Sequence, residues 1–151
     1  MAFPLPEPMR VALDEARRAA QAGDVPVGAV VTRGGEIVAT SGNAMRADHD
    51  PTAHAEMAAL REAARTLGTS RLDDCDLWVT LEPCAMCAGA IALARIARLY
   101  FAAPDPKGGA VLHGPRLFGQ PTCHHAPEVY SGIGEAEAGE LLRAFFRERR
   151  G

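Results

Sequence analysis

Three side chains in two short segments have the types and the order that a catalytic metal site needs. His54 stands in His54-Ala55-Glu56, and the two thiols stand in Pro83-Cys84-Ala85-Met86-Cys87. One imidazole and two thiolates supply three protein ligands to Zn²⁺ and leave the fourth position for water, whereas a structural zinc site is normally closed by a fourth His or Cys. The residues therefore predict a catalytic zinc site formed by His54, Cys84 and Cys87.

Glu56, two positions after His54, is predicted to be the acid-base group of this site. A carboxylate beside an activated water can take its proton and deliver it to a leaving group. Each motif alone has a simpler interpretation, because a Cys-x-x-Cys pair can be a redox pair or two core thiols, and a single histidine is usually packed or exposed. The two motifs together, with Glu56 at this offset, favour metal-assisted proton transfer.

The composition is that of an ordinary globular protein, with 48% hydrophobic and 23% charged residues. A chain of 151 residues has the length of one domain, so residues 1–151 are expected to form a single zinc-dependent domain. No apolar stretch is long enough to span a bilayer, and Met1-Ala2-Phe3-Pro4 lacks the features of a signal peptide. We therefore expect a cytoplasmic protein with no membrane partner, in which Cys75 and Cys123 are free thiols.

Hydrophobic periodicity predicts the elements that must position these residues. The predicted helices cover about 8–22, 52–66, a stretch from 83, and 135–150, and the predicted strands cover 27–32, 36–41, 76–81, 98–102 and about 129–130. This order predicts an α/β fold, a three-layer α/β/α sandwich around a mixed sheet of about five strands. The first two strands should form an antiparallel hairpin, and the later ones should be parallel.

The second and third predicted helices begin at the metal motifs. Thr52 is predicted to be the N-cap of the second helix, and Pro83 to occupy the first position of the third. Their N-termini should converge at the strand ends, where an α/β sheet usually binds its ligand. The stretch 103–127, rich in Gly, Pro and His, is predicted to be a functional loop.

A net charge of −3 argues against a protein covered in positive potential, but it permits a local basic surface. The best candidate is the stretch from Arg143 to Arg150, in which Phe145 and Phe146 stand among arginines. Such a stretch suits phosphates and unstacked bases. Arginines near a helix C-terminus are equally favoured by the helix macrodipole, so composition leaves both interpretations open.

The metal motifs and their surroundings resemble bacterial tRNA-specific adenosine deaminases of the cytidine-deaminase-like superfamily. The resemblance is carried by Asp50–Glu56 and Thr80–Ala90 and extends from about Met9 to Arg150. His-x-Glu followed by Pro-Cys-x-x-Cys is the signature of zinc deaminases that act on nucleobases. The resemblance implies a cytidine-deaminase-like fold, Zn²⁺ as the cofactor, and conversion of the wobble adenosine in a tRNA anticodon to inosine with release of ammonia. It also implies a homodimer.

The resemblance assigns further residues to the substrate, a tRNA anticodon stem-loop. These residues are Asn43, Asp105, Lys107, Phe146, Arg149 and Arg150. Asn43 would hydrogen-bond the flipped base, and Asp105 and Lys107 would lie beside neighbouring nucleotides. Without the resemblance, Asn43 and Asp105 are more readily explained as turn residues.

Two other functions fit the same motifs. A deaminase of a free nucleobase or nucleotide, of the guanine or cytosine type, would share every catalytic residue. A catalytically inactive zinc-containing RNA-binding module would keep the three ligands but would have no use for Glu56. The segment Thr80-Leu81-Glu82 before the Cys motif and the Arg-rich C-terminal stretch favour a polynucleotide substrate over a free base.

Overall fold

The computed structural model of the chain describes residues 4–150, with only the backbone of residue 150, and is built around a five-stranded sheet. The strands are β1 (Gly28–Arg33), β2 (Glu36–Gly42), β3 (Cys75–Leu81), β4 (Arg98–Ala103) and β5 (Glu128–Ser131). Their order across the sheet is β2-β1-β3-β4-β5. β1 is antiparallel to both β2 and β3, whereas β3, β4 and β5 are parallel. The predicted hairpin and the predicted parallel strands are both confirmed.

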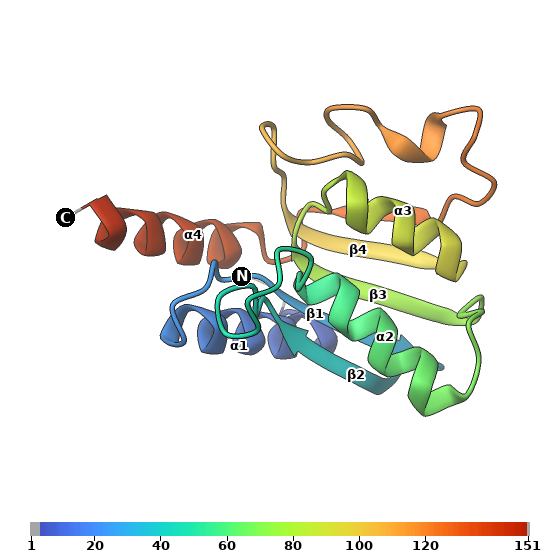
Figure 1. Ribbon diagram of the computed structural model, residues 1–151, viewed down its shortest axis with the longest axis horizontal. Coiled ribbons are helices and arrows are strands. Elements are labelled where there is room, and N and C mark those ends of the chain that lie inside the picture. Colours follow the sequence, from blue (N-terminus) through green and yellow to red (C-terminus); the bar gives the residue numbers. More distant parts are fainter. Residues whose placement is uncertain (1–3, 151) are drawn as a thin grey trace.

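Helices cover both faces of this sheet. Among the described residues the α-helices are α1 (Glu7–Gln21), α2 (Ala55–Leu67), α3 (Ala85–Ala94) and α4 (Glu135–Arg150). α2 and α3 pack on one face, and α1 and α4 pack on the other (Figure 1). The α/β fold and its predicted three-layer α/β/α sandwich are therefore confirmed.

Strand β1 contacts the helices on both faces of the sheet. Val30 points toward α1 and α4, whereas Val31 points toward α2 and α3, as alternating side chains of a strand must. At the start of the strand, a Cβ on Gly28 would lie 1.9 Å from the carbonyl oxygen of Ala12, so only glycine permits this approach to α1. The N–H of Gly28 donates to Oγ1 of Thr80 at 3.1 Å. This bond fixes the end of β3, just before the Cys motif, beside the start of β1.

Helix α2 begins later than predicted. Its first residue is Ala55, and its N-cap is His54, whose backbone is extended with φ −75° and ψ 150°. Thr52 is not the cap, because its N–H and its hydroxyl both donate to Oδ1 of Asp50, at 2.8 and 2.7 Å. Thr52 therefore belongs to the turn that leads into the helix.

Helix α3 also begins later than predicted. Its first residue is Ala85 and its N-cap is Cys84, with φ −74° and ψ 177°. Pro83 consequently lies before the helix and not at its first position. The carbonyl of Pro83 accepts the N–H of Ala110 at 2.9 Å, which ties this approach segment to the loop after β4.

Residues 104–127 connect β4 to β5 as the long loop that the composition predicts. The loop includes a short 3₁₀ helix, η1 (Leu117–Gly119), which packs against α3. In Figure 1 the loop runs above α3 and β4. It leaves β4 at the same sheet edge as the end of β3, because the two strands are parallel.

Two expectations drawn from composition concern cysteines and membranes. Cys75 and Cys123 are free thiols, as predicted, and Cys75 is fully buried. Within residues 4–150, no helix combines the length and the apolar character needed to cross a bilayer.

Candidate metal centre and active site

The three predicted metal ligands come together in the structure. Nδ1 of His54 lies 3.6 Å from Sγ of Cys84 and 3.5 Å from Sγ of Cys87. A tetrahedral ion with Zn–S of about 2.3 Å and Zn–N of about 2.0 Å sets the N···S separation at about 3.5 Å. The three side chains therefore fit Zn²⁺, and the described part of the chain contains no second cluster of potential ligands of this kind.

Two helix N-termini hold these ligands. His54 is the N-cap of α2, Cys84 is the N-cap of α3, and Cys87 follows in the first turn of α3. Neither N-cap side chain hydrogen-bonds the backbone of its own helix in the usual capping manner. Because the first-turn N–H groups carry the positive end of the helix dipole, this placement stabilises the thiolates that a metal ion needs.

The thiols of Cys84 and Cys87 have very different pKa values. The pKa of Cys84 is lowered to about 5, chiefly because the Cys87 thiol donates to its sulfur, and the backbone N–H of Cys87 and the charge of His54 act in the same direction against burial. The pKa of Cys87 is raised, because it is the donor in that bond and because it is buried. Cys84 is thus poised as a thiolate, and binding of a metal ion would displace the proton that remains on Cys87.

Glu56 lies beside this cluster without belonging to it. It is the second residue of α2, only 4% exposed, and it borders the same pocket as His54 and Cys84. Burial raises the pKa of Glu56 to about 7, although its backbone hydrogen bond and the charge of His54 oppose the shift. A carboxyl group with a pKa near neutrality can both accept and donate a proton at working pH.

The pocket beside the ligands has a volume of about 210 Å³. Apolar side chains of Val25, Val27, Met45 and Leu81 form much of its wall, and polar side chains from the loops complete it. Larger hollows of about 370 and 570 Å³ lie elsewhere on the molecule, but neither includes the ligand cluster. We therefore place the chemistry in the smaller pocket.

Asn43 lines this pocket, and its orientation is set by the helix beside it. Oδ1 of Asn43 accepts the N–H of Ala55, the first residue of α2, at 2.8 Å. Because a backbone N–H can only donate, the oxygen must face Ala55, and the amide NH₂ remains to donate to another group. Asn43 thus caps α2 from a distance and also presents a donor at the pocket.

Asp105 and Lys107 lie on the loop after β4. Asp105 lines the pocket, and its Oδ1 accepts the N–H groups of Lys107 and Gly108 at 3.2 and 3.0 Å, so it is a turn residue as well. Lys107 is exposed and does not line the pocket. Its ammonium can only approach a substrate that extends beyond the pocket.

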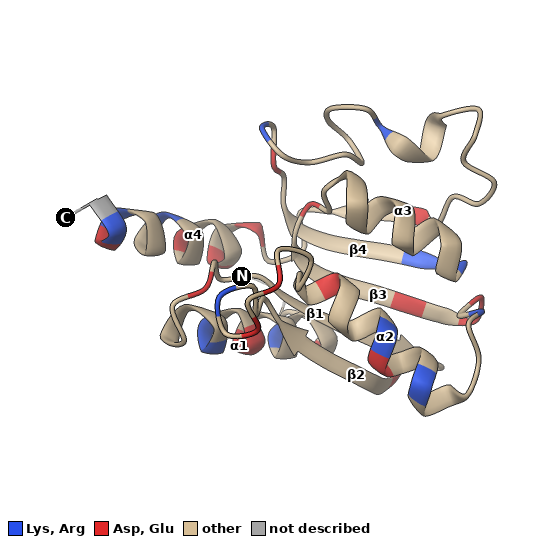
Figure 2. Ribbon diagram, in the orientation of Figure 1, with Lys and Arg blue, Asp and Glu red and all other residues tan. Residues whose placement is uncertain are grey.

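The predicted C-terminal residues stand apart from the metal cluster, and none of them lines the pocket. Phe146 is 46% exposed, and the guanidinium of Arg149 lies 4.3 Å from the ring centroid of Phe145. Arg149 also donates to the carbonyl of Gly23 at 3.1 Å. The side chain of Arg150 lies outside the described part of the structure. In Figure 2, basic and acidic residues alternate in the last turns of α4.

Two residues that lie beside predicted site residues were missed in the sequence, Arg46 beside Arg149 and Glu82 beside the pocket. Arg46 also donates to the carbonyl of Gly23, at 3.2 Å, so its guanidinium lies close to that of Arg149. No sequence signal identifies it. Glu82 borders the pocket and is 2% exposed. The available signal was an acidic residue placed directly after a buried strand.

Comparison with known proteins agrees with this geometry. Residues 6–103 match the family model for the "Cytidine and deoxycytidylate deaminase zinc-binding region". The chain is 58% identical over 142 residues to the tRNA-specific adenosine deaminase of Agrobacterium fabrum (strain C58 / ATCC 33970), and the match covers 94% of this chain and 93% of that protein. The chain belongs to the tRNA-specific adenosine deaminase family. The resemblance inferred from the motifs is confirmed.

Comparison with solved structures identifies the same deaminase fold. A structure from "Biochemical and Structural Studies of A-to-I Editing by tRNA:A34 Deaminases at the Wobble Position of Transfer RNA" superposes with a TM-score of 0.88 at 57% identity, covering 89% of this chain and 98% of that one. The guanine deaminase from Bacillus subtilis superposes with a TM-score of 0.64 at 40% identity, covering 68% of this chain and 66% of that one. The similarity to the tRNA deaminase is thus the more extensive of the two, and the cytidine-deaminase-like fold is confirmed.

Proposed function

We propose that this chain is a zinc-dependent deaminase, formed by a single domain over residues 1–151, that converts the wobble adenosine of a tRNA anticodon to inosine and releases ammonia. The observation that carries the proposal is Glu56, a buried carboxyl group with a pKa of about 7 beside three side chains that fit Zn²⁺. A structural zinc site has no use for this carboxyl group. Extensive identity with a tRNA-specific adenosine deaminase supports the substrate.

In the proposed reaction His54, Cys84 and Cys87 hold Zn²⁺, which supplies Lewis-acid activation of a water molecule. Glu56 takes a proton from the attacking water and delivers it to the adenine ring nitrogen. It then takes the remaining proton of that oxygen, now a hydroxyl on the ring carbon, and delivers it to the amine, so that the C–N bond breaks, the C=O bond forms and ammonia leaves. The raised pKa of Glu56 suits both steps, because the same carboxyl group must accept and then return a proton.

The pocket suits a single flipped base. Its volume of about 210 Å³ is below the range of roughly 300–1,000 Å³ typical of sites for drug-sized ligands. The Asn43 amide would donate to the base, and Asp105 and Lys107 would lie beside the neighbouring nucleotides. Enzymes that act on a base in a nucleic acid must bring it out of its stack, and they gain the necessary binding energy from flanking contacts.

The C-terminal helix is the proposed contact for the rest of the anticodon stem-loop. Phe146, Arg149 and Arg150 combine an exposed ring with guanidinium groups, a pairing suited to bases and phosphates. Arg46 strengthens the case, because it brings a second positive charge to the carbonyl of Gly23 that Arg149 also contacts. No acidic side chain forms an ion pair with Arg46 or Arg149 within the described residues.

A deaminase of a free base is the alternative favoured by a specific observation, the similarity to a guanine deaminase structure. Ammonia release measured on an anticodon stem-loop, adenosine, guanine and cytidine separates the two functions. We expect kcat/KM for the stem-loop to exceed that for adenosine by orders of magnitude, because free adenosine lacks the flanking contacts. Comparable values would exclude the tRNA assignment, and no release from any substrate by zinc-loaded protein would favour an inactive RNA-binding module.

The position of the product is tested by sequencing. A tRNA with the anticodon ACG should read as GCG after incubation with the protein, because inosine pairs as guanosine does. The Glu56→Ala variant is the matched control and should leave the anticodon unchanged. Since the substrate is tRNA, we also propose that the protein acts in the cytoplasm.

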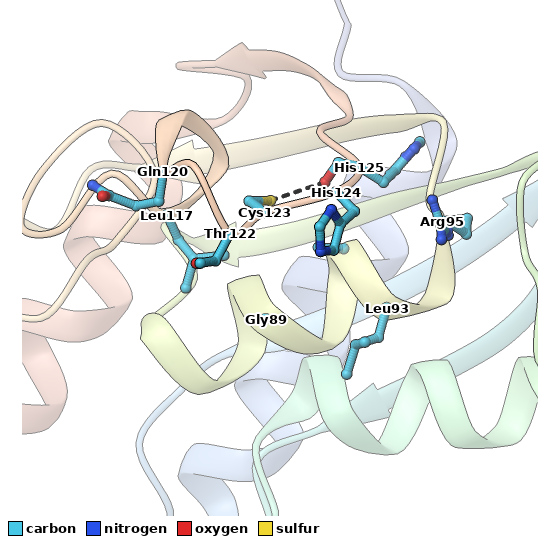
Figure 3. A pocket seen from close by; sticks show the side chains of 10 residues that line it. Gly89, Leu93, Arg95, Leu117, Gln120, Thr122, Cys123, His124 and His125 are labelled. Atoms are coloured by element: carbon cyan, nitrogen blue, oxygen red, sulfur yellow. Dashed lines mark hydrogen bonds between the residues drawn. The ribbon is translucent and has the colours of Figure 1, made fainter.

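We also propose that two copies of the chain associate through the face formed by α2 and α3. α3 contains no charged residue, and its Leu93 is 82% exposed. A hollow of about 370 Å³ separates α3 from residues 117–125, with Gly89 and Leu93 on the helix and Cys123 and His124 on the loop (Figure 3). Exposed apolar surface of this kind is typical of an interface.

Light scattering coupled to gel filtration tests this association. Leu93→Lys should convert a dimer to a monomer, because it places a charge in the centre of an apolar contact. Ile37→Lys is the matched control, since Ile37 is also an exposed apolar residue but lies on β2. A wild-type protein that remains monomeric at micromolar concentration would exclude the homodimer.

A further inference from the structure

Glu82 is a buried carboxylate with an unusual number of hydrogen-bond donors. It follows β3 directly and precedes the ligand Cys84 by two residues, and its side chain has no exposed area. Oε1 accepts the N–H of Asp105 at 3.0 Å and lies 2.8 Å from Nδ1 of His113. Oε2 accepts the N–H groups of Val111, Leu112 and His113 at 3.1, 2.9 and 3.2 Å.

All of these donors belong to one segment, residues 105–113 of the loop after β4. Two backbone bonds reinforce the attachment, from Glu82 N–H to the carbonyl of Ala103 at 2.8 Å and from Ala110 N–H to the carbonyl of Pro83 at 2.9 Å. The loop is therefore bound along its length to the short segment that joins β3 to the ligand Cys84.

The fit between the loop and the carboxylate leaves no spare room. A Cβ on Gly109 would lie 2.4 Å from Cδ of Glu82 and 2.6 Å from the carbonyl oxygen of Asp105. Both separations are far below van der Waals contact, so only glycine permits the loop to pass so close. The loop backbone at Gly109 therefore lies directly against the Glu82 carboxylate, with no room for a side chain between them.

Attaching a loop through a buried carboxylate carries a free-energy cost. Moving a charge out of water is unfavourable unless it is fully hydrogen-bonded, and among residues 4–149 no lysine or arginine forms an ion pair with Glu82. The five donors supply the compensation, since charge-assisted bonds are the stronger kind. What the buried carboxylate contributes is a fixed pocket wall, because Glu82, Asp105 and Gly108 all border the pocket that contains Glu56.

We propose that Glu82 is a positioning residue that sets the place of the loop 105–113, and with it the substrate, relative to the metal ligands on α3. It acts through the loop and not on the reacting atoms. The proposal rests on the proposed function, because the loop carries Asp105 and Lys107, which we assign to nucleotides beside the target base.

The test disturbs the contact from both sides. Glu82→Gln replaces one oxygen by an NH₂ group that faces N–H donors, and Gly109→Ala forces the loop away from an intact carboxylate. Glu36→Gln and Gly119→Ala are matched controls, because Glu36 is exposed on β2 and a Cβ on Gly119 would meet no atom within 4 Å. Zinc content, KM and kcat for an anticodon stem-loop, and hydrogen exchange at the amides of 105–113 are measured for all four variants.

We expect Glu82→Gln and Gly109→Ala to raise KM by about 10- to 100-fold, since a displacement of about 1 Å in a positioning group can cost 10²-fold. Zinc content should equal that of the wild type, kcat should change far less than KM, and the amides of 105–113 should exchange faster. The two controls should match the wild type in every measurement.

Three results would overturn the proposal. Loss of zinc would make Glu82 a support of the metal site, a fall in kcat at unchanged KM would place it in the chemistry, and unchanged KM with faster exchange would show that the loop does not position the substrate. If Glu82→Gln does not fold, Gly109→Ala decides alone. A wild-type protein that does not deaminate the stem-loop would instead refute the proposed function.

Discussion

Asn43 combines two roles that one pair of substitutions can separate. Its Oδ1 accepts the N–H of Ala55 at 2.8 Å, and its amide NH₂ is left to donate to a base in the pocket. Asn43→Ala removes both groups. Loss of a cap at a helix N-terminus costs about 1 kcal/mol, which corresponds to a fall in Tm of about 2–4 °C for a chain of this length. Loss of a donor to the base should lower kcat/KM by about 10- to 100-fold.

Asn43→Asp is the informative variant. The carboxylate keeps an acceptor for Ala55 and is favoured at a helix N-terminus, so Tm should stay within about 1 °C of the wild type. It cannot donate to the base, so kcat/KM on a stem-loop should fall as far as in Asn43→Ala. Calorimetry and single-turnover deamination provide the two measurements. Full activity in Asn43→Asp would mean that Asn43 only caps α2, and the contact with the base would have to come from another residue.

Three further outcomes are expected. Glu56→Ala should retain zinc while turnover falls by about 10²–10⁴-fold or more, whereas Cys87→Ala should lose both together; loss of zinc from Glu56→Ala would contradict its role. Replacing Arg149 and Arg150 by Ala should raise Kd for a stem-loop and flatten its salt dependence, because fewer counterions are released; an unchanged salt slope would leave them as helix-end residues. Cys75, with a pKa raised to about 11 mainly by burial, should resist iodoacetamide at pH 8 until the protein unfolds, and rapid labelling of the native protein would contradict this.

The order of elements could be predicted because the patterns that define them are local. Alternating and helical periodicities run without interruption through the strands and the long helices, and α4 begins at the predicted residue, Glu135. The meeting of His54 with Cys84 and Cys87 could also be anticipated. Their motifs begin two helices that follow strands on the same sheet, and helices in such positions start at the same sheet edge.

The starts of those two helices were predicted wrongly for a common physical reason. Thr52 and Pro83 have the intrinsic preferences of a helix start, but preference is worth only about 1 kcal/mol per position. Here the backbone is extended at His54 and Cys84 themselves, where the ligands face one another across 3.6 Å. The geometry of the ligands thus prevails over local propensity at both boundaries.

The role of Glu82 could not be predicted, because its partners lie 23 to 31 residues further along the chain. Nothing in the composition of 105–113 indicates that its amides converge on one carboxylate. The need for glycine at position 109 is likewise invisible until the loop is seen against Glu82. Contacts of this kind depend on the tertiary fold, whereas the metal motifs depend on residue type and spacing.

The two helices that form the site differ in how capping of the helix start is related to binding of the metal. In α2 the N-cap residue is the ligand His54, and the first N–H is satisfied by a separate residue, Asn43. In α3 the N-cap residue is the ligand Cys84, whose side chain makes no capping hydrogen bond, although the nearby backbone N–H groups of Cys87 and Met86 help to lower the pKa of its thiol. Stability and activity can therefore be separated by substitution at α2. At α3 they cannot, because the Cys84 thiolate binds the metal and also interacts favourably with the positive end of the α3 dipole, so Cys84→Ala should lower Tm even when zinc is withheld from both proteins.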